Sequence, residues 1–295
     1  MLRGERTHVE PFVWQEERNG CGLFFIKGWM EKDSGITAGF TSRHGGISGQ
    51  PFGSLNCGLH VQDIPGHVIG NRELLAHALH TQLRDCTYAE QVHGKEVEVV
   101  TEAHVGAGIY SRESAIQAKD AFVTNKMGIF IHALFADCVP LFFYDPAHRA
   151  VGLAHAGWRG TVLQIARETI ETMRRQFGSR PEQLLAAIGP SIQGCCYEVD
   201  EKVISKVREV LNELGADRSS NSANGGGSVY TDIGNGKFKL SLQHLNRQIM
   251  IKAGIMQAHI EISSLCTSCR TDLFFSHRKE GGRTGRMAAW IGLYE

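Results

Sequence analysis

The 295-residue sequence has no excess of either charge, no internal repeat and no long apolar run free of polar groups. Lys and Arg together number 31, as do Asp and Glu, so no overall basic field favours nucleic acid or an anionic membrane as a partner. The first 20 residues are charged and lack the apolar core of a secretory signal. The most apolar stretch, residues 128–145, contains His132, Asp137 and Pro140, which favours buried strands over a membrane helix. We therefore expect a cytoplasmic protein that binds neither nucleic acid nor membrane.

Eight cysteines without a secretory start favour reduced thiols over a disulfide framework. Cys266 and Cys269 form a C-x-x-C pair, whereas Cys195 and Cys196 are adjacent and supply no second pair of that kind. We therefore expect no second metal centre there. Small buried residues are the favoured interpretation of Cys196 and Cys266, with a place in the lining of a pocket as the alternative.

Strand-like and helix-like segments are mixed along the chain without strict alternation. Helical periodicity is clearest over residues 71–83, 161–177 and 200–215, the last with Asp200 as a cap and Gly215 as its end. Strand-like runs cover residues 96–100, 121–124, 129–135, 139–145, 150–156 and 184–189. The low-complexity segment 217–228 is typical of a flexible surface loop. This pattern predicts a single α+β domain, with mixed β-sheets flanked by helices.

Two polar residues, Cys138 and His155, lie in or beside the apolar strand-like runs at the middle of the sequence. The turn signal "DPAHR" lies between two strand-like runs, so a hairpin centred near Ala147 is expected. Cys138 lies nine residues before Ala147 and His155 eight residues after it. A tight antiparallel hairpin would place the two nearly opposite one another, with Cβ atoms about 5 Å apart. That separation allows them to share a metal ion or a proton.

A third ligand is harder to choose from spacing. Among 14 histidines, His93 in "EQVHG" is the most suggestive, because it lies at a polar, glycine-broken entry to a strand. Spacing alone does not select it. Arg159 is a candidate anion-binding residue, because it precedes a helix expected to start near Thr161, whose free N–H groups also attract anions. Arg43, in the glycine-rich "SRHGG", is a second candidate.

Six motifs appear in an order that resembles one known family. They are "TSRHGGIS" (41–48), "EQVHG" (90–94), "ADCVP" (136–140), "HAGWRG" (155–160), "IGPSIQGCCYEV" (188–199) and "FFSHR…TGRMAAWIGL" (274–293). Together they closely resemble the laccase-domain or polyphenol-oxidase family, also called the peptidoglycan-editing-factor family, some members of which are described as purine nucleoside phosphorylases. The resemblance implies a catalytic domain over residues 36–295, and residues 1–35 are then expected to be an extension packed on it.

The resemblance also implies that His93, Cys138 and His155 are metal ligands. Two imidazoles and a thiolate make a three-ligand zinc set with a fourth position open for water or substrate, and the same set also accepts copper. The implied activities are phosphorolysis of adenosine, inosine, guanosine or methylthioadenosine and deamination of adenosine. Nucleoside and phosphate are then the partners, Cys138 and His155 are catalytic as well as ligands, and Asp137 is the candidate for protonating the departing base. The oligomeric state cannot be read from the sequence.

Three other functions stay open at this point. Copper-dependent oxidation of phenols is implied by the family name, but the chain has no His-x-His pair of the kind a four-copper oxidase needs. A metal-free thiol hydrolase would use Cys138 as nucleophile and His155 as base, and would need an orienting carboxylate or amide rather than His93. A non-catalytic metal-buffering or cell-wall-associated role is the last alternative.

Overall fold

The computed structural model describes residues 9–215 and 227–294. All but the last two positions of the predicted surface loop 217–228 lie outside the described residues. Within the described part of the chain the strands form three sheets.

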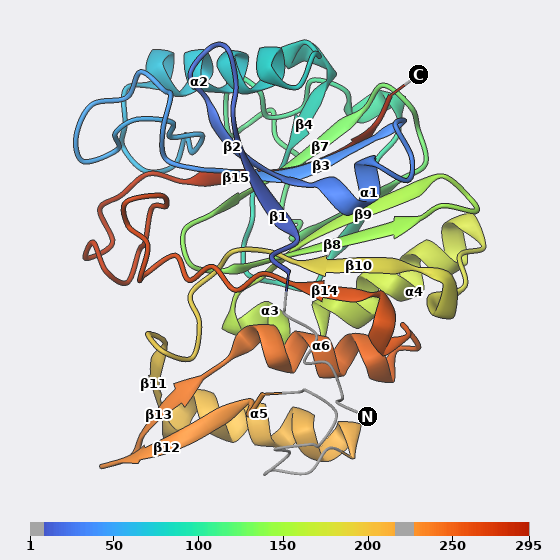
Figure 1. Cartoon of the computed structure of the whole chain (residues 1–295), viewed down its shortest axis with the longest axis vertical. Helices are drawn as coiled ribbons and strands as arrows, with labels where there is room; N and C mark the ends of the chain where they lie inside the picture. The colour runs from blue at the N-terminus through green and yellow to red at the C-terminus, as the bar shows by residue number, and fades with distance from the viewer. Residues whose placement is uncertain (1–8, 216–226, 295) are drawn as a thin grey trace, which may run out of the picture.

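The first sheet is drawn above the second in Figure 1. Its strand order is β1 (Phe12–Glu16), β2 (Gly22–Ile26), β3 (Ile36–Thr41), β15 (Met287–Leu293), β7 (Phe130–Phe135) and β4 (Cys86–Tyr88). Neighbouring strands are antiparallel except β4 and β7, which run parallel. The middle of this sheet is therefore β15, a late segment held between two early ones.

The second sheet carries the predicted hairpin. Its order is β14 (Ile260–Ile262), β10 (Leu185–Ile188), β8 (Val139–Asp145), β9 (Ala150–Ala156), β6 (Ala121–Thr124) and β5 (Val97–Val99). The edge pairs β14–β10 and β5–β6 are parallel, and the others are antiparallel. Every residue of β8 and β9 is buried, because both faces of this sheet are covered. A small third sheet has the order β11 (Glu198–Asp200), β13 (Lys237–Leu240), β12 (Tyr230–Gly234).

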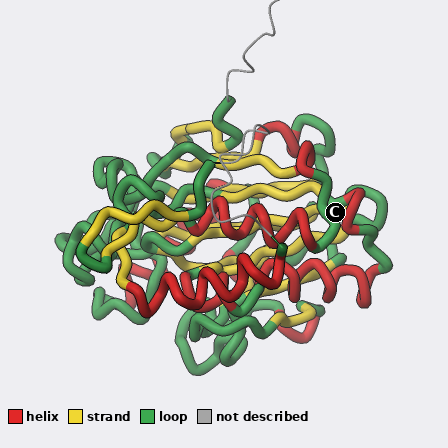
Figure 2. Tube along the Cα trace, turned by 90° about the horizontal axis from the view of Figure 1, so that it is seen from below, coloured by secondary structure: helices red, strands yellow, loops and turns green. Residues whose placement is uncertain are grey.

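Helices cover the outer faces of the two large sheets (Figure 1). The helices of the described residues are α1 (Lys27–Met30), α2 (Pro65–Ala78), α3 (Trp158–Val162), α4 (Ile165–Phe177), α5 (Glu201–Leu214) and α6 (Leu242–Lys252), with 3-10 turns at Leu83–Asp85, Glu102–His104, Pro181–Gln183 and Gln257–His259. Helix α2 lies on the first sheet, and α4 and α6 lie under the second. Figure 2 shows the same covering from below, with helices in front of the strands.

Three apolar layers hold these elements together. Aromatic and aliphatic side chains fill the space between the sheets, where the rings of Phe12 on β1 and Phe142 on β8 lie 5.6 Å apart. A second core joins the lower sheet to the helices through residues such as Ile170 and Met173 of α4. A third joins α2 to Trp290 of β15. The predicted class, α+β with mixed sheets flanked by helices, is confirmed.

The predicted helices are confirmed with two differences. The helix predicted over residues 71–83 begins and ends earlier, as α2 at Pro65–Ala78. Asp200 caps α5 by accepting a hydrogen bond from the Val203 N–H at 3.3 Å, and Gly215 ends that helix with φ 65°. The helix predicted over 161–177 is divided into α3 and α4, because Gln164 adopts a left-handed conformation with φ 60°. Among the described residues, no helix combines the length and apolarity needed to cross a bilayer.

The N-terminal segment takes part in the first sheet, since β1 pairs with β2 and β2 pairs with β3. Whether residues 1–35 are an extension of a domain over 36–295 stays a prediction.

Candidate metal centre

The β8–β9 hairpin brings Cys138 and His155 together. His155 pairs with Pro140 across the hairpin, and Cys138 lies two residues before Pro140, so the thiol and the imidazole are diagonal neighbours rather than directly opposite. The connection from β7 to β8 spans only residues 136–138, and Asp137 makes this turn with φ 84°. The hairpin predicted from the turn signal is confirmed, with a shift in the facing pair.

His93 reaches the same point from the loop between β4 and β5. The carboxylate of Asp120, directly before β6, accepts hydrogen bonds from the backbone N–H groups of Val92 at 3.0 Å, His93 at 3.0 Å and Gly94 at 2.7 Å. These contacts fix the loop around the carboxylate and set His93 in a left-handed conformation with φ 62°.

The same carboxylate orients His155. Asp120 Oδ1 lies 2.9 Å from His155 Nδ1, and the His155 backbone N–H donates to the Asp120 carbonyl at 2.7 Å. Because Nδ1 is engaged, Nε2 is the ring nitrogen left to face the Cys138 thiol. A carboxylate behind a histidine in this way is the usual support for a metal-ligating imidazole, and it also orients a catalytic base.

Charge coupling favours the thiolate of Cys138. Burial acts to raise the pKa of Cys138, but the neighbouring His155 and His93 outweigh burial and lower the pKa to about 6. For His155, burial acts to lower the pKa, and the thiolate of Cys138 together with Asp120 raises it to about 9. The thiolate is the form that ligates metals and attacks electrophiles.

The ligand atoms of His93, Cys138 and His155 all lie within 4.8 Å of one another. Cys138 Sγ is 3.9 Å from His93 Nε2, and the two imidazole rings have centroids 4.8 Å apart. Tetrahedral zinc with bonds of about 2.0–2.3 Å separates its ligands by about 3.3–3.8 Å, so the three residues fit one ion with little adjustment. The donor set, two imidazoles and a thiolate, suits zinc or copper.

A cavity of about 490 Å³ opens beside this cluster, within the usual range of about 300–1,000 Å³ for small-molecule sites. Its aromatic lining is formed by Tyr88, Trp158 and Tyr197. Its basic lining is formed by His60, Arg72, Arg112, His277, Arg278 and Arg286. Flat rings and cationic groups therefore face the same space, an arrangement suited to a planar ligand that carries or meets an anion.

The basic side chains of the cavity differ in how many of their N–H donors are already hydrogen-bonded within the protein. Arg72 is buried, donates to the carbonyls of Cys57 and Gly108 and lies over the Tyr88 ring, so it serves the fold. Arg286 donates through Nη1 to the carbonyls of Thr284 and Gly285. Burial lowers the pKa of Arg286, and such a poorly hydrated cation gains most from an anionic ligand.

Asp137 is the predicted residue that lines this cavity without being a ligand. Its carboxylate accepts hydrogen bonds from the Thr267 hydroxyl and the Arg278 backbone N–H, both at 2.7 Å. These two hydrogen bonds tie the connection between β14 and β15 to the β7–β8 turn.

The two arginines predicted to bind an anion lie elsewhere. The Arg43 guanidinium donates to the carbonyls of Gly53 and Thr271 and pairs with Glu280 at 3.0 Å, away from the cavity lining. Arg159 is exposed, with its guanidinium 5.3 Å from the Trp158 ring centroid, and it does not line the cavity either. The structure therefore does not bring these two residues to the His/Cys/His cluster.

Sequence reasoning missed Asp120, Tyr197, Arg278 and Arg286. Asp120 had one available signal, because it stands at the start of a predicted strand that pairs with the strand carrying His155. Tyr197, Arg278 and Arg286 belong to motifs quoted above, but their orientation depends on how distant loops pack.

The fold and the site together define an α+β protein with a His/Cys/His cluster at the edge of a basic and aromatic cavity. The chain belongs to the family whose model is described as multi-copper polyphenol oxidoreductase laccase, which matches residues 37–294.

Named relatives and a solved structure resemble the chain over almost its full length. The purine nucleoside phosphorylase YlmD of Bacillus subtilis (strain 168) is 41% identical over 273 residues, covering 92% of this chain and 94% of that protein. The adenosine deaminase RL5 of an unknown prokaryotic organism is 32% identical over 259 residues, covering 86% and 92%. The crystal structure of YlmD from Geobacillus stearothermophilus is 37% identical, has a TM-score of 0.87, and covers 97% of this chain and 100% of that one.

The multi-copper part of the family description does not fit the His93, Cys138 and His155 cluster. Within the described residues, His93, Cys138 and His155 form the only group of candidate ligands that includes histidine. Three ligands accommodate a single ion, and one copper of this kind transfers electrons one at a time.

Proposed function

We propose that this protein is a zinc-dependent enzyme of purine nucleosides that cleaves adenosine, inosine, guanosine and methylthioadenosine with phosphate and also deaminates adenosine. The observation that carries the proposal is the three-residue cluster of His93, Cys138 and His155 at the edge of a cavity lined by arginines and aromatic rings. The names of the relatives, purine nucleoside phosphorylase and adenosine deaminase, support the same class of substrate.

Each group of residues around the cavity has a separate role in the proposed reaction. Zinc, when bound, supplies a Lewis acid with an open coordination position. Asp120 holds His155 in its ligating tautomer, and Trp158 and Tyr197 offer flat surfaces for a purine. The cavity arginines other than Arg72 bind phosphate, because guanidinium groups match its oxygens in pairs. Asp137, with both donors in place, positions the segments that carry Thr267 and Arg278, and its proposed proton transfer to the departing base stays a prediction.

Product analysis tests this proposal. Copper-free, zinc-loaded protein is incubated with adenosine or inosine, with and without phosphate, beside a Cys138→Ala control. We expect ribose-1-phosphate and free base only when phosphate is present, and ammonia from adenosine. Absence of all of these products, or equal amounts from the control, would contradict the proposal. Oxidation of a phenolic substrate by copper-loaded protein, with no nucleoside products from the zinc-loaded form, would instead support the oxidase implied by the family name.

A second candidate rests on Asp120. The thiol-hydrolase hypothesis requires an orienting carboxylate behind His155, and Asp120 supplies one at 2.9 Å. Cys138, His155 and Asp120 therefore also form a nucleophile–base–carboxylate arrangement, in which His93 has no assigned role.

Metal removal separates the two candidates. We expect a strong chelator to abolish nucleoside turnover and zinc to restore it. Full activity in protein verified to be metal-free would discard the zinc mechanism and assign Cys138 the role of nucleophile. Replacing Cys138 distinguishes nothing by itself, because both candidates predict an inactive variant.

A further inference from the structure

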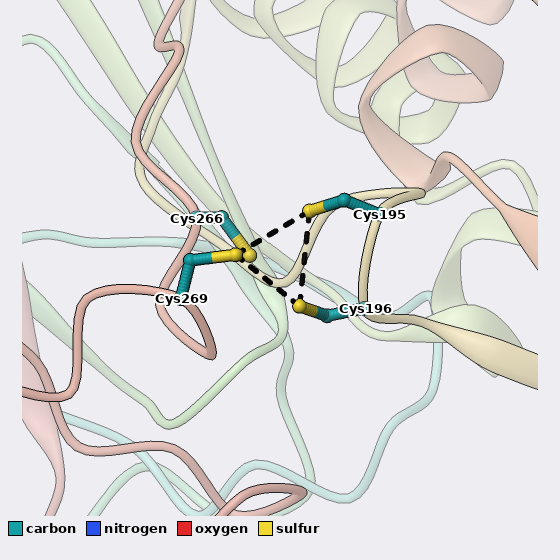
Figure 3. Close-up of side chains that lie close together, drawn as sticks. All are labelled: Cys195, Cys196, Cys266 and Cys269. Carbon is teal, nitrogen blue, oxygen red and sulfur yellow. Dashed lines mark hydrogen bonds between the residues drawn. The ribbon is translucent and has the colours of Figure 1, made fainter.

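Four cysteines outside the cavity lining form a second cluster. Cys195 and Cys196 lie in the loop between β10 and β11, and Cys266 and Cys269 lie in the long connection between β14 and β15. Their four sulfur atoms lie within 4.8 Å of one another, and all four are free thiols. Figure 3 shows the four side chains turned toward a common point between the two segments. The spacing of the cysteines predicts no second metal centre, because it supplies only one C-x-x-C pair, and the structure nevertheless brings all four thiols together.

Local turns explain how adjacent cysteines reach one point. The backbone N–H groups of Cys196 and Tyr197 both donate to the Gln193 carbonyl, at 2.9 and 2.8 Å. This single tight turn sets Cys195 and Cys196 on the same side of the loop. In the other segment the Arg270 N–H donates to the Cys266 carbonyl at 3.0 Å, a helix-like turn that aligns residues three apart.

Backbone hydrogen bonds hold the two segments side by side. The Ser191 N–H donates to the Leu265 carbonyl at 3.3 Å, and the Thr267 N–H donates back to the Ser191 carbonyl at 3.1 Å. The two pairs of thiols are therefore brought together by the fold and do not depend on each other for their placement.

The sulfur separations match those of a tetrahedral ion. The distances are 3.7 Å for Cys195–Cys196, 3.6 Å for Cys195–Cys269 and 3.3 Å for Cys196–Cys269. Zinc–sulfur bonds of about 2.3 Å in a tetrahedron separate the sulfurs by about 3.8 Å. Cys195 and Cys269 are exposed, which gives an ion a path to the cluster.

We propose that Cys195, Cys196, Cys266 and Cys269 bind one zinc ion in a closed, four-thiolate structural site. No ligand position is left open for substrate, so this ion differs in role from one at the His/Cys/His cluster. The two segments that it joins both contribute to the cavity lining, through Tyr197 on one and His277 and Arg278 on the other. The ion therefore holds together two segments that form one side of the cavity lining.

Metal analysis tests the site independently of any enzymatic activity. Wild-type protein, purified under reducing conditions and saturated with zinc, should hold two zinc ions per chain, and Cys196→Ser/Cys269→Ser should hold one. The matched control Cys21→Ser changes a buried thiol outside both clusters and should keep two. Unchanged zinc content in the double variant overturns the proposal.

A second measurement covers the case in which the double variant does not fold. Cys138→Ala removes a ligand of the other cluster and leaves all four cysteines in place. Its remaining zinc should show only sulfur neighbours, at about 2.3 Å, by X-ray absorption. A shell that includes nitrogen or oxygen, loss of all zinc, or a mass lower by two hydrogens from a disulfide among these cysteines would each overturn the assignment.

Discussion

At the scale of single residues, Gly157 shows how little free space surrounds the His/Cys/His cluster. A Cβ at this position would lie 3.0 Å from Cys138 Sγ and 3.0 Å from His93 Cδ2. The backbone itself accepts any residue there, with φ −67°. Gly157→Ala should therefore fold normally but displace two of the proposed ligands, lowering zinc affinity and nucleoside turnover at least 10-fold.

Zinc competition and steady-state kinetics measure this effect. Gly66→Ala is the control, because nothing lies within 4 Å of its added Cβ and a helix favours alanine. Normal zinc affinity in Gly157→Ala would show that the ligands do not need this space.

Asp120 supports two of the three residues in the cluster. Asp120→Asn keeps the size of the side chain but replaces one carboxylate oxygen by an N–H donor facing backbone N–H groups and removes the charge behind His155. We expect a 10- to 100-fold loss of metal affinity or activity, the usual effect of removing such a partner.

Asp145→Asn is the matched control for Asp120→Asn. Asp145 is equally buried and accepts hydrogen bonds from Ala147 and His148 at the far end of the same hairpin. It should reduce stability and leave the zinc affinity of the folded protein unchanged. Equal zinc affinities in the two variants would remove Asp120 from the site.

We expect Arg286 to contribute more to phosphate binding than the other cavity arginines, because its guanidinium is poorly hydrated. Arg286→Lys should raise the phosphate KM about 10-fold with a smaller change in kcat, since lysine lacks the paired donors of a guanidinium. Arg159→Lys, outside the cavity lining, should leave the phosphate KM unchanged. The reverse result, with Arg159 controlling KM, would restore the sequence-based expectation for that residue.

At this scale the sequence predicts which side chains are neighbours within one hairpin, but not which side chains meet where distant loops pack together. Cys138 and His155 follow from a turn and two strands, because local pairing fixes which side chains are neighbours. His93 required a family resemblance, since its loop is held beside the hairpin by hydrogen bonds to the carboxylate of Asp120, which sequence spacing does not reveal. Arg43 was chosen as an anion-binding residue because of its glycine-rich surroundings, and the segment around Glu280 that engages it is far away in the sequence.

At the scale of elements, α5 offers a direct test of a predicted cap. Asp200→Ala removes the side-chain acceptor of the Val203 N–H and an acidic group near the helix N-terminus. The expected loss is about 1 kcal/mol of unfolding free energy, measured by chemical denaturation. Nucleoside kinetics should not change, because Asp200 does not line the cavity. No loss of stability would mean that solvent satisfies this helix end equally well.

Strands β5 to β10 were predicted from the sequence, whereas β3 and β15 in the middle of the first sheet and the short strands β4, β11 and β14 were not. β7, β8 and β9 are buried at every position because both of their faces are covered, so their largely apolar sequences stand out. β4, β11 and β14 have three residues each, too few for a periodic signal. The division of the predicted helix into α3 and α4 at Gln164 was not predicted either, because the apolar face of the helix continues across Gln164.

At the scale of the whole molecule, metal binding and folding should be linked. Free zinc at 100 times the dissociation constant of one site adds about 2.7 kcal/mol to stability when only the folded chain binds it. We expect zinc to raise the Tm of chelator-treated protein by about 5 °C, measured by calorimetry. His93→Ala, which keeps the four cysteines, should retain part of this rise, and a variant lacking both clusters should show none. An equal rise in that variant would indicate non-specific binding.

The position of β15 has a consequence for the order in which this chain is made. Strand β15 bonds to β3 on one side and to β7 on the other, and it carries the Trp290 side chain that packs beneath α2. While a ribosome is still synthesising residues before Met287, β3 and β7 have no strand between them and their facing backbone groups are unpaired. The upper sheet therefore closes only after residues 287–293 have emerged from the ribosome. Until then its unpaired strand edges are exposed to aggregation, and either chaperones or fast synthesis must protect them.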